Sequence, residues 1–296
     1  MSDPDPLRPG GEEWRRMLSP SKGAAVLRVS RFDSEYALWH RTKGLIAPEP
    51  DKDIFKAGHA YEHTLAYLWR DANPGWHLSP GEVRFQRDDL GVPALATIDR
   101  RASRGRARRV VEFKIARSLE EWGDDFTDDA PADYLVQVTL QQLITGYTKY
   151  PAHLMVMGPY FKSHIYEIPF SRELADVILE RCVSFWKSLD SDVPPPLDDT
   201  KATYECVREL HPDIDGREVQ LDPELAAEYL TVDGQYKALE KRLRGLKSRV
   251  LAAMEKGQRA VVVDQKIADR RPNGKGSVSL YANTKLDPTT IEGIAA

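Results

Sequence analysis

The sequence predicts an α/β fold in which helices flank a mixed central sheet, followed by a C-terminal helical extension. Between residues 12 and 190, segments with apolar residues at helical spacing alternate with short β-branched segments. Three consecutive prolines at 194–196 then interrupt the pattern, and a strongly helical stretch covers residues 221–256. With 296 residues and 41% hydrophobic content, the chain can bury a sizeable core.

The elements follow from local spacing and from capping residues. Helices are expected from residue 12, from Ser19 or Ser21, and over 32–45, 54–70, 133–147 and 171–189, the last capped by Ser171. Strands are expected over 81–87, 92–99, 109–115, 152–157 and 164–169. The acidic stretch 120–133 indicates a solvated loop or a mobile flap.

The same patterns predict how the chain divides into domains. Residues 1–11, rich in proline and glycine, are expected to form a disordered lead-in to one domain over 12–190. A proline-rich linker is expected over 191–204. Residues 205–296 then form a helical extension that ends in a basic β-hairpin over 261–281, with Pro272-Asn273-Gly274 at its turn.

Charge and cysteine content exclude several classes of protein. The net charge of −4 provides no overall basic field, so any attraction to nucleic acid must come from local clusters such as the six arginines between positions 100 and 109. Two distant cysteines, Cys182 and Cys206, argue against an iron–sulfur cluster or a structural zinc site. No apolar run reaches the roughly 20 residues needed to span a bilayer. We therefore expect a soluble protein of the cytoplasm, without a membrane partner.

Asp99, Glu112 and Lys114 form the strongest candidate site. Side chains alternate along a strand, so Glu112 and Lys114 point to one face and Phe113 to the other, while Asp99 ends the preceding strand. Two carboxylates are the hard oxygen ligands that Mg²⁺ or Mn²⁺ prefers. A lysine beside them can position a water molecule or stabilise charge on a phosphate. The alternative is a surface hairpin with a weak cross-strand pair, worth roughly 0.2–1 kcal/mol.

Two helices add further candidates. Glu62 lies in the middle of the 54–70 helix, between His59 and His63, where it either belongs to a solvated face or presents a carboxylate to a metal. The two histidines, four residues apart, suit a transition metal, but the sequence indicates no third ligand. In the 133–147 helix, buried or groove-facing glutamines at positions 137, 141 and 142 need hydrogen-bond partners, such as a phosphate or ordered water.

Together these motifs resemble the lambda-exonuclease/YqaJ family of phage-type recombination nucleases, within the PD-(D/E)xK superfamily. The resemblance covers roughly residues 14–189. The segments that carry it, in the family's order, are Ser21-Lys22-Gly23-Ala24-Ala25-Val26-Leu27, Gly58-x-x-Tyr61-Glu62, Ile98-Asp99, Glu112-Phe113-Lys114 and Gln137-x-x-x-Gln141. It implies a restriction-endonuclease-like core, in agreement with the α/β fold expected from the pattern.

The resemblance also implies roles for individual residues. Asp99, Glu112 and the Phe113 carbonyl would bind the metal, with Glu62 completing the set directly or through water. Lys114 would activate the attacking water, and Gln137 would hold the geometry of the site.

A second group of residues is implied to bind DNA. Ser21 would grip a 5′-phosphate. The family often has an arginine shortly before this serine; Leu18 stands there in this chain, and Arg16 is the substitute we consider. The remaining candidates for contact with the DNA backbone are Arg100, Arg101, Arg104 and Gln141.

The activity implied by the resemblance is a Mg²⁺-dependent 5′→3′ exonuclease, with Mn²⁺ as the other candidate ion. It would act on linear double-stranded DNA and leave 3′ single-stranded overhangs for recombination. The resemblance further implies a ring-shaped trimer, a single-strand annealing protein as partner, and the cytoplasm of a bacterial or phage-infected cell. Two alternatives remain: an endonuclease with the same chemistry, and a non-catalytic scaffold that binds DNA ends.

Overall fold

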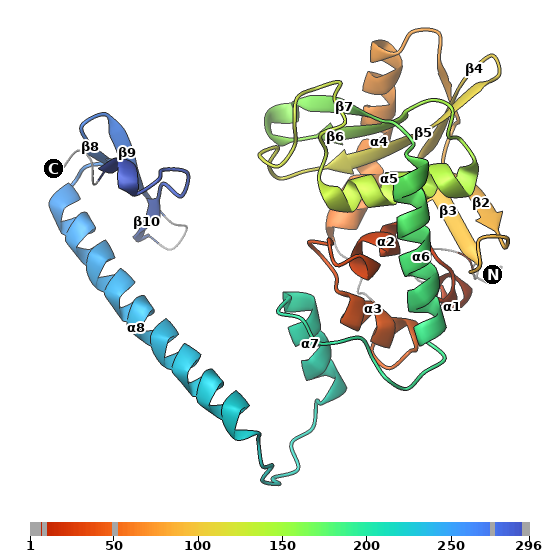
Figure 1. The fold of residues 1–296 in the computed structure, drawn as a ribbon. Helices are drawn as coiled ribbons and strands as arrows, with labels where there is room; N and C mark the ends of the chain where they lie inside the picture. The colour runs from red at the N-terminus through yellow and green to blue at the C-terminus, as the bar shows by residue number, and fades with distance from the viewer. Residues whose placement is uncertain (1–6, 8–10, 49–52, 273–275, 292–296) are drawn as a thin grey trace. The chain divides into compact units, whose positions relative to one another are not determined.

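The computed structural model describes residues 7, 11–48, 53–272 and 276–291, and it divides into two compact units, 1–214 and 215–296 (Figure 1). The first unit contains seven α-helices among the described residues. They are α1 (Glu12–Arg16), α2 (Pro20–Val26), α3 (Glu35–Thr42), α4 (Asp53–Ala72), α5 (Ala132–Thr145), α6 (Arg172–Ser188) and α7 (Lys201–Leu210). A short 3₁₀ turn, η1 (Pro159–Phe161), links two of the strands.

A five-stranded mixed sheet forms the centre of this unit, in the order β1-β4-β5-β6-β7. Only β5 and β6 pair in parallel; the other neighbours are antiparallel. A separate antiparallel pair is formed by β2 and β3. The strands are β1 (His77–Leu78), β2 (Val83–Arg87), β3 (Ala94–Ile98), β4 (Arg100–Arg104), β5 (Ala107–Ile115), β6 (Ala152–Met157) and β7 (Ser163–Ile168). The predicted mixed α/β fold is confirmed.

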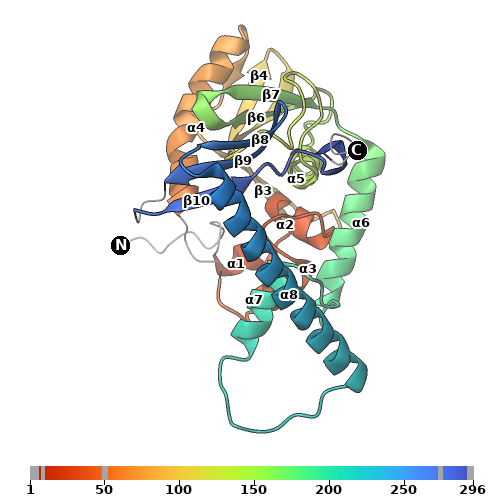
Figure 2. The same cartoon turned by 90° about the vertical axis from the view of Figure 1, so that its left-hand side faces the viewer.

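Helices α4 and α5 cover opposite faces of the central sheet (Figures 1 and 2). On one face, Trp69 of α4 packs with Val111 and Phe113 of β5. On the other, Val138 of α5 packs in a cluster with Val110 of β5. Because β5 alternates between these two cores, Glu112 and Lys114 are on the α5 side, as the strand period predicts.

The arginine-rich stretch differs from the expected structure. We predicted a long basic connection between two strands, but most of it is β4, which pairs antiparallel with β5 so that Arg100 lies opposite Val111. The turn itself contains only Gly105 and Arg106, and Gly105 has a positive φ of 56°. A pattern of apolar residues cannot reveal this strand, because four of its five residues are polar.

The boundary after the first domain also lies later than predicted. We placed a linker at 191–204, yet α7 begins within that range, at Lys201, and packs against α3, where Cys206 joins a small core with Ala37 and Ile46. The hydroxyl of Thr203 donates to Ser34 Oγ at 2.8 Å, which fixes the contact. The first compact unit therefore extends to residue 214.

The acidic loop and the second unit complete the chain. Residues 125–127 of the loop bond to β7: the Ile165 N–H donates to the Asp125 carboxylate and the Phe126 N–H to the Ile165 carbonyl, both at 2.7 Å. The loop is thus tied to a strand rather than only solvated.

The second unit contains α8 (Pro223–Met254), β8 (Arg259–Val262), β9 (Gln265–Pro272) and β10 (Val278–Ala282). Its sheet has three strands instead of the predicted two.

Two parts of the sequence-based prediction lie outside the described residues. Asn273 and Gly274 of the predicted hairpin turn are not among the described residues, and neither is most of the lead-in over 1–11. Within the described ranges, no helix combines the length and the apolar character required to cross a membrane.

Gly23 allows α2 to pack closely on α5. A Cβ atom at Gly23 would overlap Leu140 Cδ1 and lie 3.0 Å from Val136 Cγ1. Leu140 is fully buried, so its side chain has little room to move away. By contrast, a Cβ atom at Gly58, in the middle of α4, meets nothing within 4 Å.

We predict opposite effects of alanine at these two glycines. Gly23→Ala should lower the free energy of unfolding by about 1–3 kcal/mol through overpacking. Gly58→Ala should raise it by about 0.5–1 kcal/mol because alanine is the better helix former. Urea titration followed by circular dichroism would measure both. Equal effects of the two substitutions would contradict the close packing of α2 on α5.

His153 is a buried histidine whose surroundings keep it neutral. Trp69 Nε1 donates to His153 Nδ1 at 3.0 Å, so this nitrogen carries a lone pair rather than a proton. Burial, reinforced by the nearby Arg109 guanidinium, lowers the pKa of His153 to about 3. On the other side of the ring, Nε2 contacts the Arg109 guanidinium and lies 3.3 Å from Glu167 Oε1.

This environment predicts a pH dependence of stability. The pKa of His153 is about 3 in the folded protein and 6.5 unfolded, so below pH 6.5 the unfolded chain binds the extra proton and stability falls as the pH drops. The slope contributed by this residue approaches about 1.4 kcal/mol per pH unit between the two values. Denaturant midpoints of the wild type and of His153→Gln at pH 7, 6 and 5 would test it. The loss on acidification should be smaller in the variant.

Candidate active site

The pairing of β4 with β5 brings Asp99 opposite Glu112. The last paired residues are Arg100 and Val111, and continuing the register by one residue places Asp99 across from Glu112 on the same face of the sheet. Asp99 is the bend at which the chain leaves β3 and enters β4. Two carboxylates thirteen residues apart in the sequence are thus adjacent in space.

Glu112 is a buried carboxylate with a full set of donors. Its side chain is 3% exposed. Gln137 Nε2 donates to Oε1 and Gln141 Nε2 to Oε2, each at 2.7 Å, and the Lys114 ammonium also donates to Oε1. The two glutamines, four residues apart on α5, share one helical face and therefore reach the same carboxylate. These contacts fix the position of Glu112 and offset its desolvation.

Asp99 is held by the backbone of β5. The Phe113 N–H donates to Asp99 Oδ2 at 2.7 Å. The N–H and C=O of one residue in an extended strand point to the same side, so the Phe113 carbonyl is also directed toward Asp99. Burial and the neighbouring Glu112 carboxylate raise the pKa of Asp99 well above its usual value, against the opposing effect of Lys114.

Lys114 is the cation of the group. Burial by itself would lower the pKa of Lys114, but the Glu112 and Asp99 carboxylates outweigh burial and raise it above its usual value. The ammonium also lies 5.6 Å from the centre of the Tyr134 ring. A charged Lys114 therefore neutralises one of the two carboxylates, and one negative charge remains to be balanced.

Glu62 approaches this group from the α4 side of the sheet. Arg100 connects the two: its guanidinium donates to the Asp99 carbonyl at 2.5 Å and lies 3.4 Å from Glu62 Oε2. Glu62 Oε1 is also 2.9 Å from His59 Nδ1. The ligand atoms of Glu62, His59 and Glu82 lie within 4.8 Å of one another, a second arrangement that can hold a cation. Glu82 is the third ligand that the sequence did not indicate, because it lies 20 residues from Glu62 along the chain.

The structure places Arg100 differently from the prediction. We expected it on the surface against the DNA backbone, but it is 2% exposed and its guanidinium packs over the Phe113 ring. Arg100 faces α4 because it pairs with Val111, whose side chain is on that face. It is therefore a positioning residue for Glu62 and the Asp99 turn, and it is not available as a surface contact.

The other arginines of the hairpin retain exposure to different degrees. Arg104 is exposed and lies over the Trp76 ring at 4.8 Å, and Arg109 lies over the same ring at 4.2 Å. Arg101 is half-buried; its backbone bonds with Ser79. Arg104 thus has the exposure that a contact with DNA requires, while Arg109 is occupied within the fold.

The segment predicted to bind a phosphate lies at the N-terminal end of α2. Ser19 is the N-cap residue and Ser21 is exposed, with the two hydroxyl oxygens 3.3 Å apart. Arg16 is also exposed, 3.5 Å from Glu12. Leu18 is completely buried and bonds through its backbone to Pro93 and Leu95 beside β3. Position 18 is therefore a core position, which explains why it does not carry an arginine.

Lys22 fixes this segment from within. Its buried ammonium donates to the carbonyls of Trp14, Arg15 and Met17 at 2.7–2.9 Å and lies over the Trp14 ring at 4.1 Å. It thereby ties the C-terminal end of α1 to α2. In the sequence, Lys22 is visible only as part of the Ser21–Leu27 motif, and its contacts with α1 follow from no local spacing.

Tyr134 is a further site residue that was not predicted. It precedes Gln137 and Gln141 by three and seven residues on α5, so helical periodicity places it on the same face. Its ring stacks on Trp122 with centroids 5.2 Å apart, and Arg31 lies 5.1 Å from its centre. Arg31 also forms two 3.0 Å contacts with the Asp133 carboxylate. These contacts hold the first turn of α5 in place beside Lys114.

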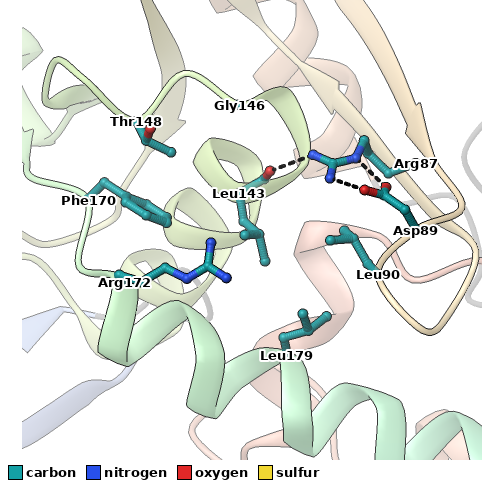
Figure 3. Close-up of a pocket in the computed structure, with 9 residues that line it drawn as sticks. All are labelled: Arg87, Asp89, Leu90, Leu143, Gly146, Thr148, Phe170, Arg172 and Leu179. Atoms are coloured by element: carbon teal, nitrogen blue, oxygen red, sulfur yellow. Dashed lines mark hydrogen bonds and ion pairs between the residues drawn. The ribbon is translucent and has the colours of Figure 1, made fainter.

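A separate pocket of about 490 Å³ lies at the C-terminal end of α5 (Figure 3). Leu90, Leu143, Phe170 and Leu179 contribute apolar side chains, and Arg87 at its rim is paired with Asp89 at 2.5 Å. None of its lining residues belongs to the carboxylate group. The chemistry of the candidate site is therefore independent of this pocket.

Comparisons with known proteins give structural neighbours only. No family model and no curated protein matches the sequence. The fold is similar to an alkaline exonuclease from Laribacter hongkongensis, with 16% identity, 60% of this chain and 92% of that chain covered, and a TM-score of 0.46. It is also similar to a phage-related exonuclease from Haemophilus somnus, with 12% identity, 58% and 92% coverage and a TM-score of 0.43. The activity of this chain is inferred from its own residues.

The donor set fits a divalent metal ion. Asp99 and Glu112 supply buried carboxylate oxygens, and the Phe113 N–H donates to Asp99, which places the backbone of Phe113 beside them. Oxygen donors of this type suit Mg²⁺ and Mn²⁺.

We predict that Mg²⁺ or Mn²⁺ stabilises the protein and that Asp99→Asn abolishes the effect. At a cation concentration 100 times Kd, the stabilisation should be about 2.7 kcal/mol. Without cation, Asp99→Asn should be more stable than the wild type, by on the order of 1 kcal/mol, because it removes the charge next to Glu112. Thermal unfolding with chelator or cation would measure both effects. As a control, Glu82→Gln should keep the response; its loss there would assign the ion to the His59 group.

Proposed function

We propose that this protein is a metal-dependent deoxyribonuclease that hydrolyses phosphodiester bonds. The observation that carries the proposal is the convergence of Asp99, Glu112 and Lys114, with Glu112 fixed by Gln137 and Gln141. A module that only bound DNA would gain nothing from buried carboxylates, because phosphates would be repelled by them. The exonuclease names of the structural neighbours agree with this proposal.

Each residue of the group has a specific task in such a reaction. Asp99, Glu112 and the Phe113 carbonyl would hold the metal ion, which supplies Lewis-acid stabilisation of the phosphate charge and lowers the pKa of bound water. Lys114, kept charged by the two carboxylates, would orient the attacking water and stabilise negative charge as it develops. Gln137 and Gln141 keep Glu112 from rotating away. Arg100 holds Glu62 near the group from the other face.

The finer proposal is a 5′→3′ exonuclease that acts on ends of double-stranded DNA and leaves 3′ overhangs. Ser21 and Arg16, both exposed, are the proposed contacts for a 5′-phosphate, and Arg101 and Arg104 for the duplex backbone. Mg²⁺ is the proposed ion. A ring-shaped trimer, a single-strand annealing partner and action in a bacterial or phage-infected cell follow from the family resemblance and are part of this proposal.

A second candidate is an endonuclease with the same chemistry. The observation in its favour is Leu18, which fills a core position where the family often places an arginine for the DNA end. Without that arginine, the selection of a 5′-phosphate rests on Ser21 and Arg16.

The test uses linear duplex DNA, with and without a 5′-phosphate, beside a closed circle, in Mg²⁺ and in Mn²⁺. Loss of label from phosphorylated 5′ ends with an intact circle supports the exonuclease. Nicking of the circle supports the endonuclease. Binding without cleavage under either ion contradicts the proposed nuclease activity.

We predict that Lys114→Met reduces the rate of cleavage by roughly 10²–10⁴-fold, the range for removal of a group that assists proton transfer. Lys201→Met, an exposed lysine at the start of α7, is the matched control and should keep the wild-type rate. Unfolding midpoints would confirm that both variants are folded. If Lys114→Met cleaved DNA at the wild-type rate, the site would lie elsewhere.

A further inference from the structure

Helix α8 carries a continuous apolar stripe that no described residue of its own unit covers. None of the 32 residues of this helix is buried. We call the stripe the α8 seam. Its residues are Leu225, Tyr229, Val232, Tyr236, Leu239, Leu243, Leu246 and Val250. The first seven side chains are 40–66% exposed. Leu230, also exposed, lies off the stripe.

The spacing of the seam is that of a coiled coil. Its residues are separated alternately by four and three positions from Leu225 to Val250, so the pattern repeats every seven residues. An α-helix with 3.6 residues per turn keeps such a repeat on one side only if it supercoils around a partner helix. A helix that packs on a globular core usually has a wider stripe, with apolar residues at three or four positions per two turns.

We propose that the α8 seam pairs with the α8 seam of a second copy of this chain, and that the two helices run antiparallel. The charges of α8 support both choices. The first half of the helix carries Glu224, Glu228 and Asp233 with one lysine, whereas the second half carries five basic residues and Glu240. Two such helices attract each other when the acidic half of one lies along the basic half of the other.

The residues that flank the seam disfavour the parallel arrangement. In a parallel pair, Glu228 would face Asp233 of the other copy, and Arg242 would face Lys247, so like charges meet twice along each side. Such contacts are destabilising. In the antiparallel pair with full overlap, Glu228 instead lies beside Arg249, and Gln235 beside Arg242.

One kind of like-charge contact remains in the antiparallel pair, between Asp233 of one copy and Glu240 of the other, and the twofold symmetry repeats it. Each of these carboxylates is already paired within its own helix. Asp233 is 2.6 Å from Lys237 Nζ, and Glu240 is 3.5 Å from Arg244. The repulsion between them is therefore partly compensated.

Full overlap also uses every seam residue. It pairs Leu225 with Val250, Tyr229 with Leu246, Val232 with Leu243, and Tyr236 with Leu239, and the twofold symmetry repeats each pair. A helix of 32 residues is about 48 Å long, so the interface would run along most of its length. Such a twofold contact joins only two chains and cannot close a ring of three. It would therefore exist in addition to the contacts of a trimeric ring.

The test compares the mass of the full-length chain with that of two variants by light scattering. Leu239→Asp together with Leu243→Asp places charges in the seam and should halve the mass of the assembly. Ala238→Asp, on the outer side of the helix, is the control and should leave it unchanged. A monomeric wild type, or the same mass for the seam variant, would overturn the proposal. Circular dichroism would show whether α8 remains helical in both variants.

Cross-linking tests the direction of the helices and does not depend on a destabilised variant. Oxidation should join two chains when Leu225→Cys and Val250→Cys are combined in one chain, but not when either is present alone. The native Cys182 and Cys206 are buried, and burial raises the pKa of these thiols to about 12 and 11, so they react slowly. Linkage by Leu225→Cys alone would indicate a parallel pair, and no linkage by the double variant would contradict the pairing.

Discussion

The buried Glu112 carboxylate is the feature on which the rest of the site depends. It lies between β5 and α5, where water is excluded, and it is acceptable there only because Lys114, Gln137 and Gln141 donate to both of its oxygens. These donors come from the strand itself and from a single helical face. The position of α5 on the sheet is therefore constrained by polar contacts as well as by apolar packing.

The second carboxylate makes the site costly for the fold. Asp99 has its own backbone donor from Phe113, but it stands next to Glu112, and Lys114 can neutralise only one of the two charges. Apolar packing around Val110 and Val138 provides the stability that tolerates this arrangement. A site that is unfavourable without a cation, in an otherwise well-packed core, is typical of residues kept for chemistry rather than for folding.

Much of this site could be predicted from the sequence, because strand and helix periods are local properties. The two-residue period of a strand places Glu112 and Lys114 on one face of β5. The four-residue spacing of Gln137 and Gln141 places both on one face of α5. The register of β4 could not be predicted in this way. Arg100 appeared to be part of a polar turn, and only its pairing with Val111 shows that it is buried and directed toward Glu62. Similarly, Glu82 joins His59 and Glu62 through a tertiary contact that no short spacing encodes. Tyr134, by contrast, could have been found from its helical spacing to Gln137 and Gln141.

The two units differ in how they satisfy their apolar residues. In the first unit, helices α4, α5 and α6 bury residues such as Leu65, Leu140 and Ile178 against a sheet or another helix. Helix α8 differs: the residues of the α8 seam repeat every seven positions, and among the described residues of its unit the three strands leave that seam exposed. A repeat of this kind is stabilising only when another helix completes it, so the sequence of α8 encodes an intermolecular contact rather than a core.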